Sequence, residues 1–154
     1  MKLSIREICI FSMLGAIMYI SKALLEFLPN VHLIATFIAA FTIVYGVKAL
    51  FPIYVFVFLT GFMNGFNTWW IPYLYIWAVL WGALMCLPKS IPEKIKPFAY
   101  IGVCVMHGLF YGTLYAPFQA LFYGLSFKGT IAWIIAGLPW DAVHATGNLA
   151  TGVL

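Results

Sequence analysis

The stretch ALFPIYVFVFLTGFMNGFNTWWIPYLYIWAVLWGALMCLP, residues 49–88, runs for 40 residues without a charged side chain. A helix needs roughly 20 apolar residues to cross the hydrocarbon core of a bilayer, so this stretch is long enough for two crossings. Its polar centre, residues 64–68 with the sequence NGFNT, predicts the turn between them, because Asn and Gly tolerate the positive φ angles that turns need. The stretch therefore predicts a helical hairpin embedded in a membrane.

The composition of the whole chain favours the same environment. Of its 154 residues, 65% are apolar and 8% are charged, against roughly 45–50% and 25% in an ordinary soluble domain. The 12 charged side chains cannot cover a chain with 14 Phe, 9 Tyr and 6 Trp without leaving large exposed apolar patches. We therefore predict an all-α integral membrane protein, with residues 1–154 forming one domain.

Charged residues and turn signals divide the chain into six predicted transmembrane helices in one bundle. Their approximate ranges are residues 5–28, 31–46, 48–63, 69–87, 97–123 and 139–154. Residues 124–138 are ambiguous, because an apolar stretch is followed by Gly137-Leu138-Pro139, which is typical of a helix start with proline in the first turn. We favour a short interfacial or re-entrant piece there. The alternative is one long helix from Gly129 to Leu154 with a kink at Pro139.

The basic residues predict the orientation. Lysine and arginine are enriched in cytoplasmic loops, and a cytoplasmic N-terminus puts six of the eight on that side. These six are Lys2, Arg6, Lys48, Lys89, Lys94 and Lys96, while Lys22 and Lys128 fall on the outer side. Both termini are then predicted to be cytoplasmic. The basic residues form no stripe interleaved with aromatics on a soluble face, so no nucleic-acid partner is expected.

The sequence offers little support for hydrolytic or metal chemistry. The three cysteines lie singly in apolar stretches, so neither a zinc site nor a disulfide framework is expected. Neither H-E-x-x-H nor G-x-S-x-G occurs, and no glycine-rich loop could hold a phosphate. We expect no catalytic residue, no metal and no cofactor.

Polar residues inside apolar helices are functional candidates because they are costly in lipid. Asp141, His144 and Asn148 stand at i, i+3 and i+7 on one face of the last predicted helix. They form either the wall of a ligand site or an interior polar network. His107 lies near mid-membrane in the fifth predicted helix, and Gln119 lies nearer its outer end.

A second group of candidates gathers at the predicted outer face. Two polar turns and a stretch dense in tryptophan and tyrosine meet there, and such rings either anchor a protein in the headgroup layer or stack on planar ligands. With the residues of the last two helices, the predicted substrate-binding set is Glu26, Asn30, His32, Asn67, Trp69, Trp70, Tyr73, Gln119, Trp140, Asp141, His144 and Asn148.

The first predicted helix carries small residues towards one side, namely Ser12, Gly15, Ala16 and Ala23. Small residues allow helix backbones to approach closely in lipid. The partner of this face is either a helix of the same chain or another membrane subunit.

Taken together, the six predicted helices, the small-residue face, the Leu28-Pro29-Asn30-Val31 turn and the aromatic outer turn resemble the S components of energy-coupling factor (ECF) vitamin transporters. The segment Gly137-Leu138-Pro139-Trp140-Asp141-Ala142-Val143-His144-Ala145-Thr146-Gly147-Asn148 is similar to the last helix of many bacterial members. The resemblance implies a multi-pass protein of the bacterial cell membrane that captures a vitamin or related micronutrient at its outer face. It also implies a transmembrane coupling subunit, docked on the small-residue face, and two ATPase subunits that hydrolyse ATP.

Two other hypotheses remain open at this point. One is a small intramembrane enzyme, or a metal- or haem-binding membrane protein, that uses Asp141, His144 and His107. The other is a structural or channel-forming subunit, although the third and fourth predicted helices have almost no polar residues to line a pore.

Overall fold

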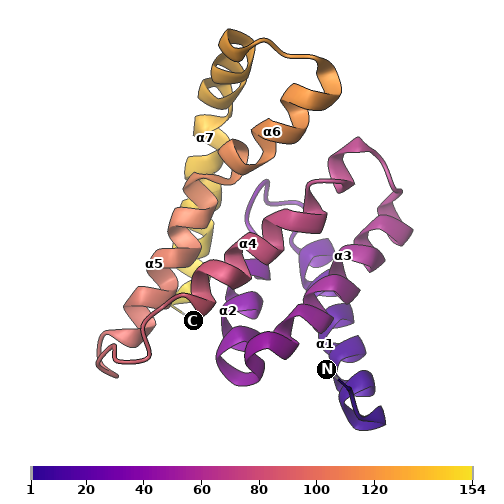
Figure 1. Ribbon diagram of the computed structural model, residues 1–154, viewed down its shortest axis with the longest axis vertical. Helices are drawn as coiled ribbons and strands as arrows, with labels where there is room; N and C mark the ends of the chain where they lie inside the picture. The colour runs from indigo at the N-terminus through magenta and orange to yellow at the C-terminus, as the bar shows by residue number, and fades with distance from the viewer. Residues whose placement is uncertain (1, 154) are drawn as a thin grey trace.

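The computed structural model describes residues 2–153, and within this range the chain is helical with no strands. Figure 1 shows the arrangement of the helices. In chain order the elements are α1 (Ile5–Leu24), α2 (Ile34–Tyr45), η1 (Gly46–Ala49), α3 (Leu50–Asn64), η2 (Thr68–Trp70), α4 (Tyr73–Met85), α5 (Lys96–Leu109), α6 (Tyr111–Tyr123) and α7 (Phe127–Gly152).

Three helical segments are long and apolar enough to cross a membrane by length and composition. They are Ile5–Leu24, Ile34–Asn64 and Lys96–Tyr123. Many large apolar side chains on these segments are exposed, including Met13, Phe62 and Phe98. Such a surface suits lipid better than water.

The first half of the chain, α1 to α4, holds most of the apolar core. Met18, Ile38, Phe56 and Leu80 are fully buried there, and Trp77 is 1% exposed. α1 packs along α3, with Gly15 of α1 against Pro52 and Val55 of α3. The core therefore forms between large side chains that several helices contribute.

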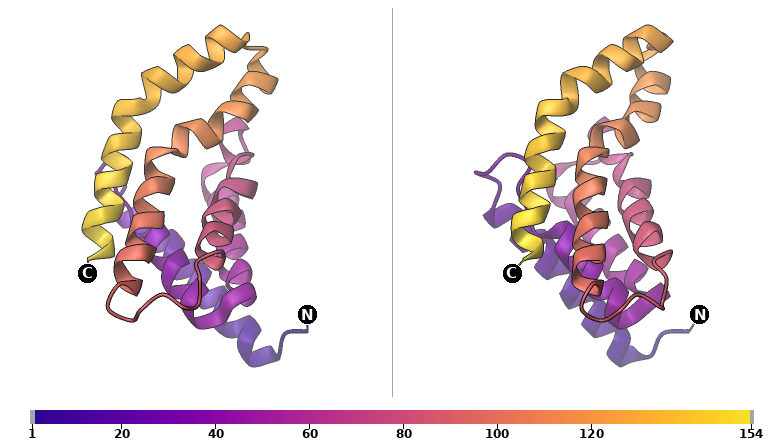
Figure 2. Two further views of the ribbon diagram at one scale, coloured as in Figure 1. Left: turned by 60° about the vertical axis from the view of Figure 1, so that its left-hand side comes forward. Right: turned by 90° about the vertical axis from the view of Figure 1, so that its left-hand side faces the viewer.

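The second half consists of α5, α6 and α7, and α7 runs alongside both of the others (Figure 2). A Cβ atom on Gly108 of α5 would lie 2.9 Å from the backbone of Ala145 in α7. Asn148 of α7 donates to the Cys104 carbonyl of α5 at 2.8 Å. These helices therefore approach one another through small residues and are joined by polar bonds.

The structure differs from the predicted helices in two places. The predicted helix 97–123 is divided into α5 and α6 at Phe110, where φ is −101° and ψ is 10°. Residues 127–152 form one helix that continues through Pro139, so the break predicted at Gly137-Leu138-Pro139 is absent and no separate interfacial piece precedes the last helix.

The alternative of one long helix agrees better with these bounds. The short connection between α6 and α7, residues 124–126, has a local cause at each end. Gly124 ends α6 in the left-handed conformation, with φ 65°, which suits glycine. Ser126 then caps α7 by accepting from the Gly129 N–H at 3.2 Å. Proline inside a helix removes one backbone hydrogen bond, and Figure 2 shows α7 as a continuous curved helix rather than two pieces.

Candidate functional site

A cavity of about 290 Å³ lies where the segment between α1 and α2 passes beside α4, α6 and α7. We name it the histidine pocket, and its lining residues are Lys22, Leu25, Glu26, Leu28, Pro29, Asn30, Val31, His32, Tyr73, Tyr111, Tyr115 and His144. Residues from four parts of the chain therefore meet around one space.

Local conformation explains how the α1–α2 segment reaches this position. Asn30 adopts a positive φ of 58°, which asparagine tolerates better than most residues. Its side-chain amide donates to the Trp140 carbonyl of α7 at 3.3 Å. Gly147 of α7 lies beside this segment, and a Cβ atom there would be in van der Waals contact with Val31 at 3.4 Å. The Asn30 bond holds the α1–α2 segment against α7, and His32 of this segment lies at the pocket wall.

The three histidines of the chain gather at this site. The ring centroids of His32 and His144 are 4.8 Å apart, and those of His107 and His144 are 6.5 Å apart. Tyr111 lies against His144 at 4.7 Å, and Trp77 lies 5.8 Å from His32 and 5.7 Å from His107. These histidine, tyrosine and tryptophan rings form one continuous cluster, and each of them carries a polar atom.

One hydrogen bond identifies the protonated nitrogen of His107. Its Nε2 lies 3.1 Å from the Ile76 carbonyl, and a carbonyl only accepts, so Nε2 carries the hydrogen. Nδ1 of the neutral ring is then a free acceptor, and it is buried without a partner among residues 2–153. His107 itself is buried behind the pocket and is not among the residues that line it.

Three further buried nitrogen atoms in the cluster have no partner among the described residues: His32 Nδ1, His144 Nε2 and Trp77 Nε1. A buried polar atom without a partner costs free energy. Burial also lowers the pKa of His32 to about 4, so its imidazole is neutral at pH 7. The cluster therefore offers unsatisfied, uncharged hydrogen-bonding groups.

Tyrosines link α4 to α6 beside the pocket. Tyr75 donates to the Leu114 carbonyl at 2.8 Å, and Tyr115 donates to the Trp69 carbonyl. Tyr73 stacks edge-on against both Trp69 and Trp77. Of the tyrosines that line the pocket, Tyr115 is therefore held by a bond to the backbone, and Tyr73 is held by its aromatic neighbours.

The pocket entrance carries one charge of each sign, on Lys22 and Glu26. The formal charge of its lining is otherwise zero if the histidines are neutral. Neither a polyanion nor a polycation is complementary to such a lining.

Five of the predicted substrate-binding residues line the pocket: Glu26, Asn30, His32, Tyr73 and His144. Tyr111 and Tyr115 also line it and were not predicted. Their signal in the sequence was the spacing His107, Tyr111, Tyr115 at i, i+4 and i+8, which places them towards one side of a helix.

The other predicted residues lie outside the pocket lining. Both carboxylate oxygens of Asp141 accept from the Gly112 N–H of α6, at 3.0 and 3.2 Å. The Asn148 amide bonds α5, and Trp70 donates to the Val57 carbonyl of α3 at 2.8 Å. Four more lie elsewhere, with Asn67 and Trp140 exposed and Trp69 and Gln119 half-buried.

The predicted docking face is divided by the packing of α1. Gly15 is buried against α3, whereas Ser12 and Ala23 are exposed and Ala16 is half-buried. Close contact within the chain therefore accounts for Gly15, and the other three remain accessible to a partner.

The histidine pocket suits a small planar molecule. Aromatic rings provide its walls, and unpaired nitrogen atoms provide donors and acceptors for the edge of a ring. No three His, Cys, Asp or Glu side chains among residues 2–153 are arranged to hold a metal ion. Comparisons with models of known protein families, with curated proteins and with solved structures found no match to this chain.

Proposed function

We propose that this chain is a membrane-embedded binding protein for a small micronutrient, acting as the S component of an ECF-type importer. The observation that carries the proposal is the histidine pocket, with its aromatic walls and buried unpaired nitrogen atoms. Ligand pockets are typically concave and mainly apolar, with a few convergent polar groups. This pocket is more polar than that, because Lys22, Glu26, Asn30 and two histidines line it together with the tyrosine rings.

The ligand we infer is a planar heteroaromatic molecule of one or two rings. A ring that bonds to His144 Nε2 at the pocket wall would satisfy a nitrogen that is otherwise buried without a partner among the described residues. Its faces would stack on Tyr73, Tyr111 or Tyr115, which line the cavity. The single Lys22 and Glu26 at the entrance are compatible with a neutral or zwitterionic ligand.

The charge distribution supports a pocket that opens away from the cytoplasm. The pocket lies beyond the C-terminal end of α1, and six of the eight basic residues lie towards the opposite end of the bundle. We propose six spans, with both termini in the cytoplasm of a bacterium, in accordance with the positive-inside tendency.

Delivery of the ligand would require partners, because the sequence has no phosphate-binding loop. We propose that Ser12, Ala16 and Ala23 on the accessible side of α1 dock on a transmembrane coupling subunit. Two ATPase subunits would then drive transport. Small residues there would permit the close helix approach that association in lipid favours.

An enzyme or metal-binding function built on Asp141, His107 and His144 has less support. The Asp141 carboxylate accepts from the Gly112 N–H of α6, and Asp141 does not line the pocket that His144 borders.

The first test is to purify the protein in a mild detergent and identify co-purifying small molecules by mass spectrometry. We expect a planar heteroaromatic compound that is retained by the native protein and lost from His144→Ala. Thr146→Ala is the matched control, because Thr146 is exposed on the same helix. An equal loss in both variants, or a compound without an aromatic ring, would contradict the proposed site.

The second test concerns the partners. Ala16→Leu is expected to abolish co-purification with the coupling and ATPase subunits while leaving ligand retention unchanged, because added volume prevents close helix contact. Met13→Leu is the control, since Met13 is an exposed large residue on the same helix. Retention of the subunits by Ala16→Leu would exclude docking at this face.

A further inference from the structure

A second cavity, of about 620 Å³, lies at the end of the bundle away from the histidine pocket. It is formed by the end of α2, the end of α4 and the beginning of α5. One wall is apolar and includes Ile43, Leu84 and Met85, while Lys89, Glu93 and Lys96 lie at its rim. We name this cavity the basal groove.

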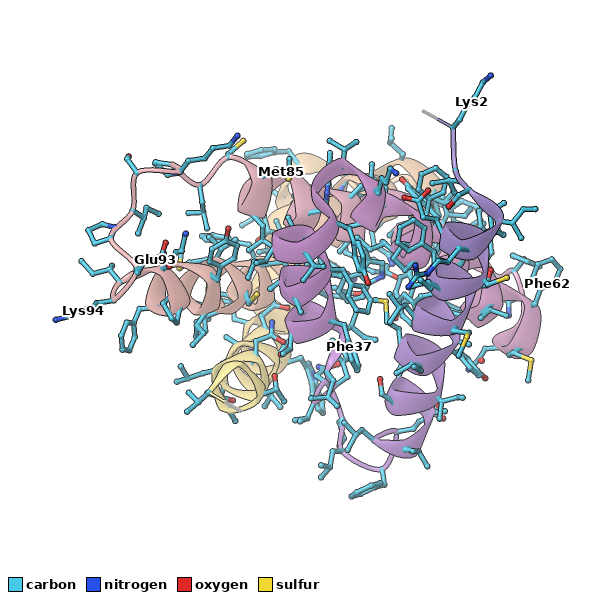
Figure 3. The ribbon with its side chains drawn as sticks, turned by 90° about the horizontal axis from the view of Figure 1, so that it is seen from below. Lys2, Phe37, Phe62, Met85, Glu93 and Lys94 are labelled. Atoms are coloured by element: carbon cyan, nitrogen blue, oxygen red, sulfur yellow. The ribbon has the colours of Figure 1, made fainter. Side chains whose placement is uncertain are left out.

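The α4–α5 segment, residues 86–95, borders the groove. In Figure 3, which views the molecule from this end, Met85 lies at the start of this segment and Glu93 and Lys94 at its far side. Lys94 points outward, away from the helices. The groove therefore has an apolar wall beside charged residues, two of which, Lys89 and Glu93, lie on a segment made of turns.

Charge is distributed unequally between the two ends of the molecule. The basal end contains Lys2, Arg6, Lys48, Lys89, Lys94 and Lys96 against Glu7 and Glu93, a formal charge of +4. This value equals the net charge of the whole chain. The remaining charged residues, Lys22, Lys128, Glu26 and Asp141, cancel.

Two of these basic residues form ion pairs with the two glutamates. Lys48 pairs with Glu7, and Lys96 pairs with Glu93 at 2.6 Å. Lys89 forms no ion pair with a described residue, although it lies at the rim of the groove. A free ammonium group thus stands beside an apolar wall.

We propose that the basal groove binds an anionic phospholipid. Lys89 would hold the phosphate, with Lys96 nearby, and an acyl chain would lie along Ile43, Leu84 and Met85. The apolar wall favours a lipid over a free phosphate, and the basic rim favours an anionic headgroup over a neutral one. This site is independent of the ligand of the histidine pocket.

The test uses the full chain in a neutral detergent, with added phosphatidylglycerol and, separately, phosphatidylcholine. Binding is measured by native mass spectrometry and by the shift in Tm. We expect phosphatidylglycerol to bind and raise Tm, and phosphatidylcholine to do neither. Equal effects of the two lipids would overturn the proposal.

Charge variants should move the affinity in opposite directions. Lys89→Gln should weaken phosphatidylglycerol binding by about fivefold, because each lysine near an anionic surface contributes modestly. Glu93→Gln should strengthen it, since this change frees Lys96 from its ion pair. Lys128→Gln is the control, because it removes the same charge from the far end of the molecule. If Lys128→Gln weakens binding as much as Lys89→Gln, binding depends on the net charge of the protein and not on the groove.

A further pair of variants tests the apolar wall. Ile43→Trp should fill the groove and reduce phosphatidylglycerol binding, whereas Val44→Trp, at an exposed neighbour outside the lining, should not. The last experiment adds inorganic phosphate as a competitor. If it competes with phosphatidylglycerol at equal concentration, the site recognises an anion only and the lipid assignment is wrong.

Discussion

The two halves of this molecule are held together in different ways. Between α1 and α4, large side chains such as Phe56 and Trp77 interlock in a fully buried core. Between α5 and α7, Gly108 lies against the backbone of Ala145, and Asn148 bonds the Cys104 carbonyl. Both halves have a close glycine contact, at Gly15 and at Gly108, but the first half adds a large apolar core and the second half adds polar bonds between helices.

Both kinds of packing suit the lipid environment that the composition predicts. Lipid tails are as apolar as leucine, so helices in a bilayer associate through close packing and polar bonds rather than through the hydrophobic effect. The histidine pocket lies between the two halves, with Tyr73 from the first and Tyr111 and His144 from the second. Its shape therefore depends on both modes of packing.

The largest expected effect is at the close contact in the second half. Gly108→Leu would place a side chain where a Cβ atom alone lies 2.9 Å from the Ala145 backbone. Backbone cannot move aside as a flexible side chain can, so we expect α5 and α7 to separate and little folded protein to be recovered. The measurement is monodisperse yield in detergent, followed by Tm.

Gly102→Leu is the matched control for this prediction. Gly102 is on the same helix, and a Cβ atom there would meet nothing within 4 Å. If both variants fold equally well, the close approach of α5 to α7 does not contribute to stability.

The second prediction tests the packing of the first half. Phe56→Ala should destabilise the protein by roughly 3 kcal/mol, because it leaves a cavity in a core that cannot fully collapse. Phe58→Ala should cost much less, since Phe58 is 45% exposed on the same helix. Denaturant or thermal unfolding in detergent provides the comparison, and similar losses in the two variants would contradict a tightly packed core.

The third prediction separates stability from binding in the second half. Asp141→Ala removes the acceptor of the Gly112 N–H and should cost about 1–2 kcal/mol. Asp141→Asn keeps an acceptor oxygen and should cost less. Retention of a co-purified ligand should survive in both variants that fold. A loss of ligand from folded Asp141→Asn would show that this side chain serves the pocket instead.

The smallest expected effect concerns pH at the junction of the halves. The pKa of His32 is lowered to about 4 by burial, whereas an imidazole in the unfolded chain titrates near 6.5. Below about pH 6.5 the unfolded chain therefore binds this proton first, so stability should fall as pH decreases towards 4 and level off below it. The ionisable groups around His32 are Lys22, Glu26, Tyr73, His107, Tyr111 and His144.

His32→Asn should reduce this pH dependence. The measurement is the difference in Tm between pH 7 and pH 5 for the native protein and the variant. An unchanged difference would mean that His32 is not held neutral by its surroundings.

Much of the helical architecture could be predicted from the sequence. The turn at residues 64–68 and the segment after residue 86 separate helices as expected, because glycine, asparagine, proline and charge mark helix ends locally. The division at Phe110 was not predicted, and the continuity through Pro139 was predicted only as the alternative to a break there. Both depend on how α6 and α7 pack, and a helix interrupted by proline can either break or bend.

The candidate site was predictable only in part. Helical spacing placed Asp141, His144 and Asn148 on one face, but it could not show that His144 borders the pocket while Asp141 bonds α6 and Asn148 bonds α5. A helix face about 100° wide meets more than one neighbour, and the identity of each neighbour is a property of the packed bundle.

The sequence by itself determined that this chain is apolar, helical and basic towards one end, because composition and local periodicity depend only on nearby residues. Only the tertiary structure decided that His32, His107 and His144 form one cluster, with His32 and His144 at the pocket wall. These residues come from three separate segments, and their approach depends on Asn30 bonding α7 and on Gly108 leaving room for the backbone of Ala145. Such distances are fixed by packing between segments that are remote in the sequence, and no local pattern encodes them.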